Sequence, residues 1–304
     1  MLYISLIICF VVSILLSLIA KRSAMTIEET DKPENKFHKT VIPSLGGLAI
    51  IISFIAGISI VSPNFTYTIP IIIGATIIAI TGVLAERFQL TVKWKFIGQT
   101  IAALVVIVWG GVQVSSIYTL QGGYIEFGYL TIPLTLVWII GITNGINLSP
   151  SLDGLAKGVS TIALITMTLM AYITGDSFVA NTGGLLIAST LGFLLVSSYS
   201  PKILIGDKTS FFLGFMIAVL SISGFNNVMM IYIPAYILGV PIVLHYYLLG
   251  KGFTFKQTVS ICCSIAAIFS LGAFIFSTSI MWGAIIILTV IFVSSQFLSK
   301  YRFI

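Results

Sequence analysis

The residues best suited to chemistry lie in one short stretch, TNGINLSPSLDGLAKGV, at positions 143–159. Asn144 and Asn147 are three residues apart, so they share one face if they end a helix. Asp153 and Gly154 then form a turn signal, and the chain on both sides is strongly apolar. Two interpretations are open: a solvated loop with an Asn cap and an Asp-Gly turn, or a site that holds a polar ligand at a membrane surface.

Composition assigns the chain to the membrane. Hydrophobic residues make up 58% of the 304 residues and charged residues only 8%, with a mean hydropathy of +1.13. Soluble domains carry about 25% charged residues, so this chain is suited to a lipid bilayer. The three cysteines, Cys9, Cys262 and Cys263, all lie in apolar stretches. That placement favours core packing over a disulfide framework or a metal site.

Apolar segments of about 20 residues, the length that crosses a bilayer, recur along the whole chain. They predict an all-α polytopic integral membrane protein of about eleven transmembrane helices in a single domain, 1–304. The predicted segments are roughly 2–20, 43–62, 68–85, 96–115, 129–147, 157–174, 181–199, 210–224, 227–248, 258–276 and 279–298. Lys21 and Arg22 follow the first segment directly, in place of a small-residue cleavage site, so we expect it to be retained.

The basic residues predict the orientation. All 15 Lys and Arg residues fall on one side of this map, and the opposite loops carry none. By the positive-inside rule that side is cytoplasmic, which places the N-terminus outside and the C-terminus inside. The net charge of +6 is therefore a topological signal, and we expect no nucleic acid partner.

Further polar residues lie at the same predicted cytoplasmic ends. His38 precedes Gly46 and Gly47, a pair that suits either tight helix packing or the approach of a phosphate to backbone N–H groups. Glu86 ends the third segment, where it is either a functional carboxylate or half of a surface ion pair with Arg87. The sequence predicts a cytoplasmic cleft built from loops 21–42, 86–95, 148–156, 200–209 and 249–257.

Several of these stretches resemble the motifs of one family of membrane enzymes. Six residues match the pattern NxxN-x-x-DGxDGL in order: Asn144, Asn147, Leu148, Asp153, Gly154 and Leu155. The stretch Gly206–Phe215 is similar to the family's G-D-x-G-S-x-x-L-G-F, and Lys95 with Gln99 matches its K-x-x-x-Q. On these motifs the chain is identified as a divergent member of the polyprenyl-phosphate N-acetylhexosamine-1-phosphate transferases, glycosyltransferase family 4. That family includes undecaprenyl-phosphate GlcNAc-1-phosphate transferases and the phospho-MurNAc-pentapeptide translocase.

The resemblance is incomplete at positions that carry the family's chemistry. Ala85 and Glu86 stand where the family has an Asp-Asp pair, and Pro150 replaces the first Asp of the DGxDGL pattern. The family's His-rich cytoplasmic loop after the ninth segment is absent. His245 lies alone in an apolar run, where a packed or interfacial role is the simpler interpretation.

The resemblance implies a role for each matched residue. Mg²⁺, or Mn²⁺ in its place, would be held by Asp207 and Asp153. Asp153 and Glu86 would be the catalytic carboxylates. The residues that face nucleotide, sugar or phosphate would be Asn144, Asn147, Lys95, His38, Gly46, Gly47 and Ser210.

Two functional hypotheses follow. The first is transfer of a sugar-1-phosphate from a UDP-sugar to a polyprenyl phosphate at the cytoplasmic face of the inner membrane, initiating cell-envelope glycan synthesis. The sugar-1-phosphate that we expect is N-acetylhexosamine-1-phosphate. The second is a catalytically silent relative that binds polyprenyl phosphate or nucleotide-sugar, or serves as a membrane partner in envelope assembly. A homodimer or an envelope-assembly protein is the expected protein partner. A transporter has less support, because the acidic residues lie at helix ends and not within spans.

Overall fold

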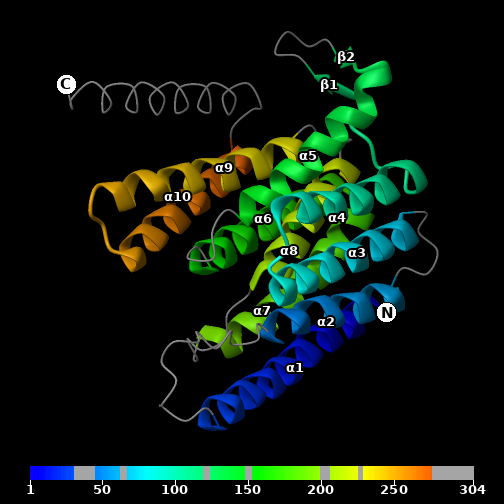
Figure 1. Ribbon diagram of the computed structural model, residues 1–304. Helices are drawn as coiled ribbons and strands as arrows, with labels where there is room; N and C mark the ends of the chain where they lie inside the picture. The colour runs from blue at the N-terminus through cyan, green and yellow to red at the C-terminus, as the bar shows by residue number, and fades with distance from the viewer. Residues whose placement is uncertain are drawn as a thin grey trace.

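The computed structural model describes residues 1–30, 45–61, 67–118, 124–147, 153–198, 206–224 and 229–275. In these ranges the chain forms ten α-helices and a small hairpin (Figure 1). The helices are α1 (Leu2–Thr30), α2 (Leu45–Val61), α3 (Thr68–Phe88), α4 (Val92–Leu104), α5 (Thr131–Ile146), α6 (Asp153–Thr174), α7 (Ser177–Ser198), α8 (Gly206–Ser223), α9 (Met229–Gly250) and α10 (Phe255–Ile275). The strands β1 (Ser116–Tyr118) and β2 (Tyr124–Glu126) pair antiparallel between α4 and α5.

The structure confirms an all-α, multi-pass membrane protein. Each of the first ten predicted segments overlaps a helix, although the fourth, 96–115, is helical only as far as Trp109, and the eleventh, 279–298, lies outside the described residues. Among the described residues, six helical segments are long and apolar enough to cross a bilayer, and three shorter apolar helices lie within α2, α6 and α8. The orientation of the termini stays a prediction from the charge pattern.

Several helices begin or end inside the predicted loops. Helix α1 continues to Thr30, so part of the predicted loop 21–42 is helical. Helix α3 runs to Phe88 and α4 begins at Val92, which leaves a short turn in which Gln89 adopts a left-handed conformation, φ 47°, and caps α3. An apolar run marks the stretch that suits lipid, whereas a helix continues for as long as its backbone groups stay paired. Loops predicted from hydropathy are therefore longer than the real connections.

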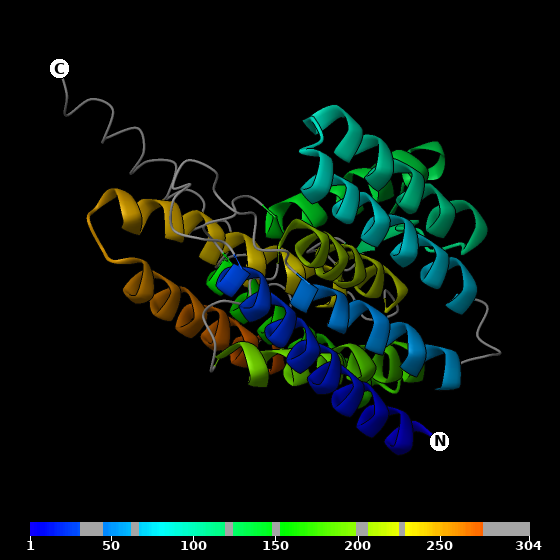
Figure 2. The same ribbon diagram turned by 60° about the horizontal axis from the view of Figure 1, so that its bottom comes forward.

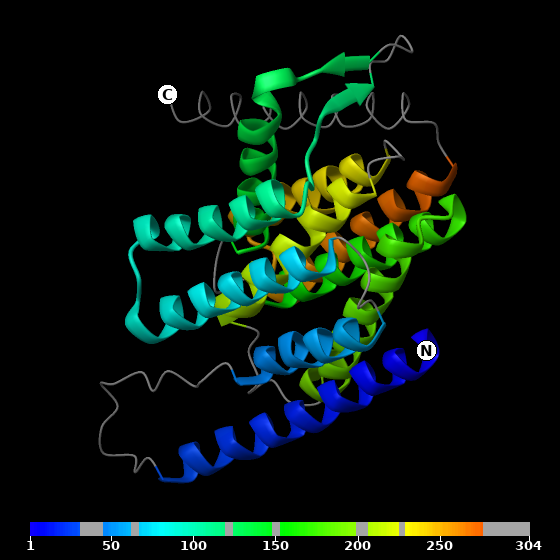
Figure 3. The same cartoon turned by 90° about the vertical axis from the view of Figure 1, so that its right-hand side faces the viewer.

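Helix α8 is the centre of the bundle, because beyond its polar first turn it is almost entirely apolar. All of its residues from Lys208 to Ile222 are buried, and α2, α3, α5, α6, α7 and α9 pack against it. Around this core, α1 packs on α7 and α2, while α10 packs on α9 and α6 (Figures 1 and 3). Because α8 is surrounded by other helices, its first turn lies close to the ends of the helices that pack against it.

The basic side chains gather at one end of the bundle. The C-terminal end of α1 and the α9–α10 turn lie on the opposite side of the molecule from the N-terminus (Figure 2). This end, here called the basic end, also holds the α3–α4 turn, which lies on the same side as the C-terminal end of α1 (Figure 3), and the first turn of α8, which contacts the end of α3. Its described basic residues include Lys21, Arg22, Arg87, Lys93, Lys95, Lys208, Lys251 and Lys256.

Candidate functional site at the basic end

An ion pair joins α3 to the first turn of α8. The Lys208 ammonium lies 3.1 Å from the Glu86 carboxylate oxygen Oε2, and the Lys208 backbone N–H donates to Oε1 over 3.4 Å. The Lys208 side chain is 6% exposed and the Glu86 side chain 20% exposed. Glu86 is therefore mostly withdrawn from water, and its carboxylate faces Lys208 on α8.

Glycine permits the close approach that forms this ion pair. A Cβ atom on Gly82 would lie 2.7 Å from the Lys208 Cβ and 3.0 Å from its backbone nitrogen, and it would overlap the Lys208 Cα. Gly82 lies one turn before Glu86 on α3. Small residues let transmembrane helices pack backbone to backbone. The α3–α8 contact thus fixes the point along α8 that the Glu86 carboxylate contacts.

A reciprocal amide pair joins α4 to α5. Asn144 donates from Nδ2 to the Gln99 Oε1 at 2.6 Å, and Gln99 donates from Nε2 to the Asn144 Oδ1 at 3.1 Å. Asn144 Nδ2 also donates to the Ile140 carbonyl oxygen at 2.8 Å. Gln99 is 1% exposed. Asn144, which is predicted to face the substrate, therefore has a structural role, because it satisfies the hydrogen bonds of the buried Gln99 amide on α4.

The end of α5 is held against α8 by a second glycine contact. A Cβ atom on Gly214 would lie 2.7 Å from the Cα of Thr143, the residue before Asn144. Asn147 follows at the C-cap of α5, where its backbone N–H donates to the Asn144 carbonyl oxygen at 3.0 Å. Both Asn residues thus end one helix, as their spacing predicts. The Asn147 side chain is partly exposed.

Lys95 completes the described group of polar residues. Its ammonium lies 5.7 Å from the centre of the Phe211 ring on α8, within the range of a cation–π contact. Ser210 is 4% exposed and Thr209 is fully buried. The Thr209 hydroxyl has no hydrogen-bond partner among the described residues. The first turn of α8 therefore presents buried hydroxyl groups beside two lysines.

The remaining predicted residues are placed as follows. Asp153 is the first residue of α6 and Asp207 the second of α8, so both belong to helix N-termini at the basic end. Gly46 and Gly47 are buried in the first turn of α2, which packs against α1, α7 and α8. His38 lies outside the described residues. The roles assigned to these residues stay predictions.

The structure adds one residue that sequence reasoning missed and confirms another interpretation. Lys208 occupies a variable position of the G-D-x-G-S-like motif, and nothing in the sequence links it to Glu86, 122 residues away. His245 is fully buried, and its ring meets Phe255 edge-on with 5.8 Å between centroids. The packed role predicted for His245 is confirmed.

The fit of a divalent metal depends on which carboxylates remain available. Among the described residues there is no group of three or more His, Cys, Asp or Glu side chains that could hold a metal ion. Both Glu86 oxygens already face Lys208. As placed here, Glu86 does not fit a ligand role, and the carboxylates left for Mg²⁺ are the predicted Asp153 and Asp207.

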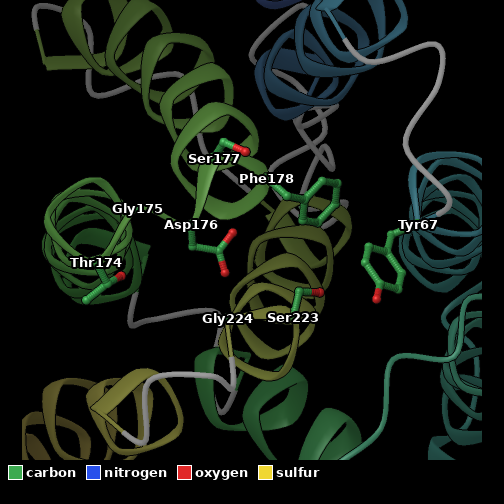
Figure 4. A pocket seen from close by; sticks show the side chains of 8 residues that line it. All are labelled: Tyr67, Thr174, Gly175, Asp176, Ser177, Phe178, Ser223 and Gly224. Atoms are coloured by element: carbon green, nitrogen blue, oxygen red, sulfur yellow. The ribbon is translucent and has the colours of Figure 1, made fainter.

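A cavity of about 470 Å³ lies at the other end of the bundle (Figure 4). Asp176 points into it between Thr174 and Ser223, and the rings of Tyr67 and Phe178 form one wall. One Asp176 oxygen already accepts the Val179 N–H at 3.0 Å, which caps α7. No predicted site residue lines this cavity. Size alone does not make it the chemical site, because the polar groups of the family motifs are at the basic end.

Comparison with known proteins points to one family. A family model described as glycosyl transferase family 4 matches residues 68–225, which contain the ion pair, the amide pair and the first turn of α8. The chain is 34% identical to a probable undecaprenyl-phosphate N-acetylglucosaminyl 1-phosphate transferase of Bacillus subtilis, over 98% of this chain and 92% of that protein. It is 29% identical to a phospho-N-acetylmuramoyl-pentapeptide-transferase of Halalkalibacterium halodurans, over 76% of this chain and 78% of that protein.

Proposed function

The chain belongs to glycosyl transferase family 4, and from this membership and its basic-end site we propose that it transfers a sugar-1-phosphate from a UDP-sugar to a polyprenyl phosphate. We place the reaction at the cytoplasmic face of the inner membrane, as a first step of cell-envelope glycan synthesis. The sugar that we propose is an N-acetylhexosamine, since both relatives described above are named for such sugars.

One observation carries the proposal. Within the stretch matched by the family model, two lysines, one carboxylate and two amides converge where α3 and α5 end and where α4 and α8 begin. Both substrates are phosphates, and phosphates bind best to cations, amide donors and helix N-termini. The helices that position these groups are the ones held closely together by Gly82 and Gly214.

The proposed reaction is a phosphoryl substitution. An oxygen of the lipid phosphate attacks the β-phosphorus of the UDP-sugar, a new P–O bond forms, and the bond from that phosphorus to the α–β bridging oxygen breaks. The products are polyprenyl-diphosphate-sugar and UMP. Such transfers depend mainly on positioning and on neutralising negative charge.

The polar residues named next have separate roles in that substitution. Lys95 attracts the diphosphate, Asn147 donates to the nucleotide-sugar, and the Gln99–Asn144 pair holds the end of α5 in place. Asp153 and Asp207, at the first turns of α6 and α8, would hold Mg²⁺ or Mn²⁺. When bound, that ion would neutralise charge on the diphosphate.

A silent binding protein is the second candidate, and two observations favour it. Ala85 is 3% exposed and has no group that could act on a substrate. Glu86, the carboxylate beside it, is paired with Lys208. UMP release that is absent from the natural chain but appears after Ala85→Asp with Pro150→Asp would identify a site that has lost its chemistry.

The test is UMP release by the purified chain in detergent, with UDP-GlcNAc and undecaprenyl phosphate. We expect turnover that requires both substrates and a divalent cation, and that Asp207→Asn abolishes. Glu126→Gln, in the hairpin at the other end of the bundle, is the matched control and should retain full turnover. Binding of nucleotide or lipid without turnover for any of several UDP-sugars would support the silent alternative.

A further inference from the structure

Lys208 is a cation in a position that disfavours cations. It is the third residue of α8, whose N-terminus carries partial positive charge, and the residue is only 4% exposed. A buried ammonium is costly unless a counter-charge and hydrogen bonds compensate it. Glu86 supplies both, because one carboxylate oxygen meets the ammonium and the other meets the backbone N–H of the same residue.

The same contacts decide what else Glu86 can bind. A Mg²⁺ ion bound to Oε2 would need a distance of about 2.0–2.1 Å. The Lys208 ammonium lies 3.1 Å from that oxygen, so the two cations would be held within about 5 Å of each other in a site with little water to screen them. The Lys208 backbone packs directly against Gly82, so the native contact between α3 and α8 brings the two cations together at this short range.

We propose that Lys208 acts as a built-in cation that occupies the Glu86 carboxylate and keeps divalent metal ions off it. Glu86 is then a positioning residue, which ties α3 to the first turn of α8, and any metal ion at this end of the bundle is held by other carboxylates. This inference rests on the proposed function, because it decides which carboxylates can hold a metal ion at the proposed transferase site.

The test measures cation binding and not turnover, so its failure is distinguishable from failure of the proposed function. Mn²⁺ alone is titrated into the purified chain in detergent and followed by the loss of the free-ion electron paramagnetic resonance signal. Glu86→Gln should change the Mn²⁺ dissociation constant by less than about twofold. Glu126→Gln, which removes a carboxylate from the exposed hairpin, is the matched control.

Removal of the lysine should expose Glu86 as a ligand. Lys208→Met is expected to tighten Mn²⁺ binding roughly tenfold, whereas Lys208→Arg, which keeps a cation there, should not. The gain should disappear in the double variant Lys208→Met with Glu86→Gln. That double variant also removes the carboxylate that has lost its Lys208 counter-charge, so it should melt at a higher temperature than Lys208→Met alone.

Three results would overturn the proposal. The first is weaker Mn²⁺ binding in Glu86→Gln with Lys208 in place, which would make Glu86 a ligand in the natural chain. The second is a gain in Lys208→Met that survives Glu86→Gln, and the third is no gain at all in a folded Lys208→Met. Where Lys208→Met does not fold, the comparison of Glu86→Gln with the natural chain still decides.

Discussion

The close contact between α3 and α8 makes a sharp prediction for Gly82→Ala. The added methyl group would lie 2.7 Å from the Lys208 Cβ and 3.0 Å from its backbone nitrogen, closer than side-chain carbons normally approach. Because the obstacle is largely backbone, the helices must separate. Forcing a methyl group into a packed interface costs about 1–3 kcal/mol of unfolding free energy.

The change is measured by thermal unfolding in detergent, followed by tryptophan fluorescence. Trp138 is a suitable reporter because its indole N–H donates to the Ser221 hydroxyl on α8 at 3.1 Å. For a chain of this size about 2–4 °C is lost per kcal/mol, so Tm should fall by roughly 2–12 °C. UMP turnover should fall on the order of 100-fold, since the displacement moves the Glu86–Lys208 pair at the site.

Gly141→Ala is the matched control. It is also a glycine-to-alanine change inside an apolar helix, but a Cβ atom there would meet no atom within 4 Å. Alanine favours the helix over glycine by up to about 1 kcal/mol, so Tm should stay constant or rise slightly. If Gly82→Ala melted at the same temperature as Gly141→Ala, the backbone contact that positions Glu86 would be refuted.

The remaining predictions concern the other polar groups of the site. Asn144→Leu should lower the unfolding free energy by about 1–3 kcal/mol, because the buried Gln99 amide loses its partner. The double variant Gln99→Leu with Asn144→Leu should recover part of that loss, and an unchanged Tm in Asn144→Leu alone would contradict the structural role of the pair. Lys95→Met should raise KM for the UDP-sugar by about tenfold. Its Tm should change little, since the contact with Phe211 is worth only about 0.5–1 kcal/mol at a partly exposed site. Lys95→Arg should keep most of the affinity, and equal losses of affinity in both variants would argue against a charge-based role. Lys208→Met should cost about 3–5 kcal/mol of unfolding free energy, because the Glu86 carboxylate loses the ammonium that faces it. The cost is measured as the Tm difference from Lys208→Arg, and the assignment of a buried ion pair fails if the two variants melt together.

The helices and their order were predictable from the sequence, because apolar runs and basic loops are local signals. Asn144 and Asn147 could be placed at a helix end, and His245 in a packed environment, for the same reason. The extension of α1 to Thr30 and the hairpin at Ser116–Glu126 were not predicted. Neither follows from hydropathy, because α1 continues beyond its apolar run and each strand of the hairpin is only three residues long.

The contacts of the site were not predictable, because they join residues distant in sequence. From the sequence, Glu86 is either a functional carboxylate or the partner of the adjacent Arg87. Its partner Lys208 reaches it only because Gly82 lets α8 approach α3. Asn144 and Gln99, 45 residues apart, belong to two separate sequence motifs. Their reciprocal hydrogen bonds form only when α4 and α5 pack together, which the motifs do not predict.

The central claim is that this chain moves phosphate together with the sugar, and the most direct measurement follows the β-phosphorus. UDP-GlcNAc with radioactive phosphorus at the β position is incubated with undecaprenyl phosphate, a divalent cation and the purified chain, and the lipid is then extracted. Sugar-1-phosphate transfer predicts radioactivity in the lipid, an equal amount of UMP in the water phase, and loss of both in Asp207→Asn. The account would be contradicted if the radioactivity stayed in the water phase, either as UDP or, for every labelled UDP-sugar tried, as the unreacted UDP-sugar.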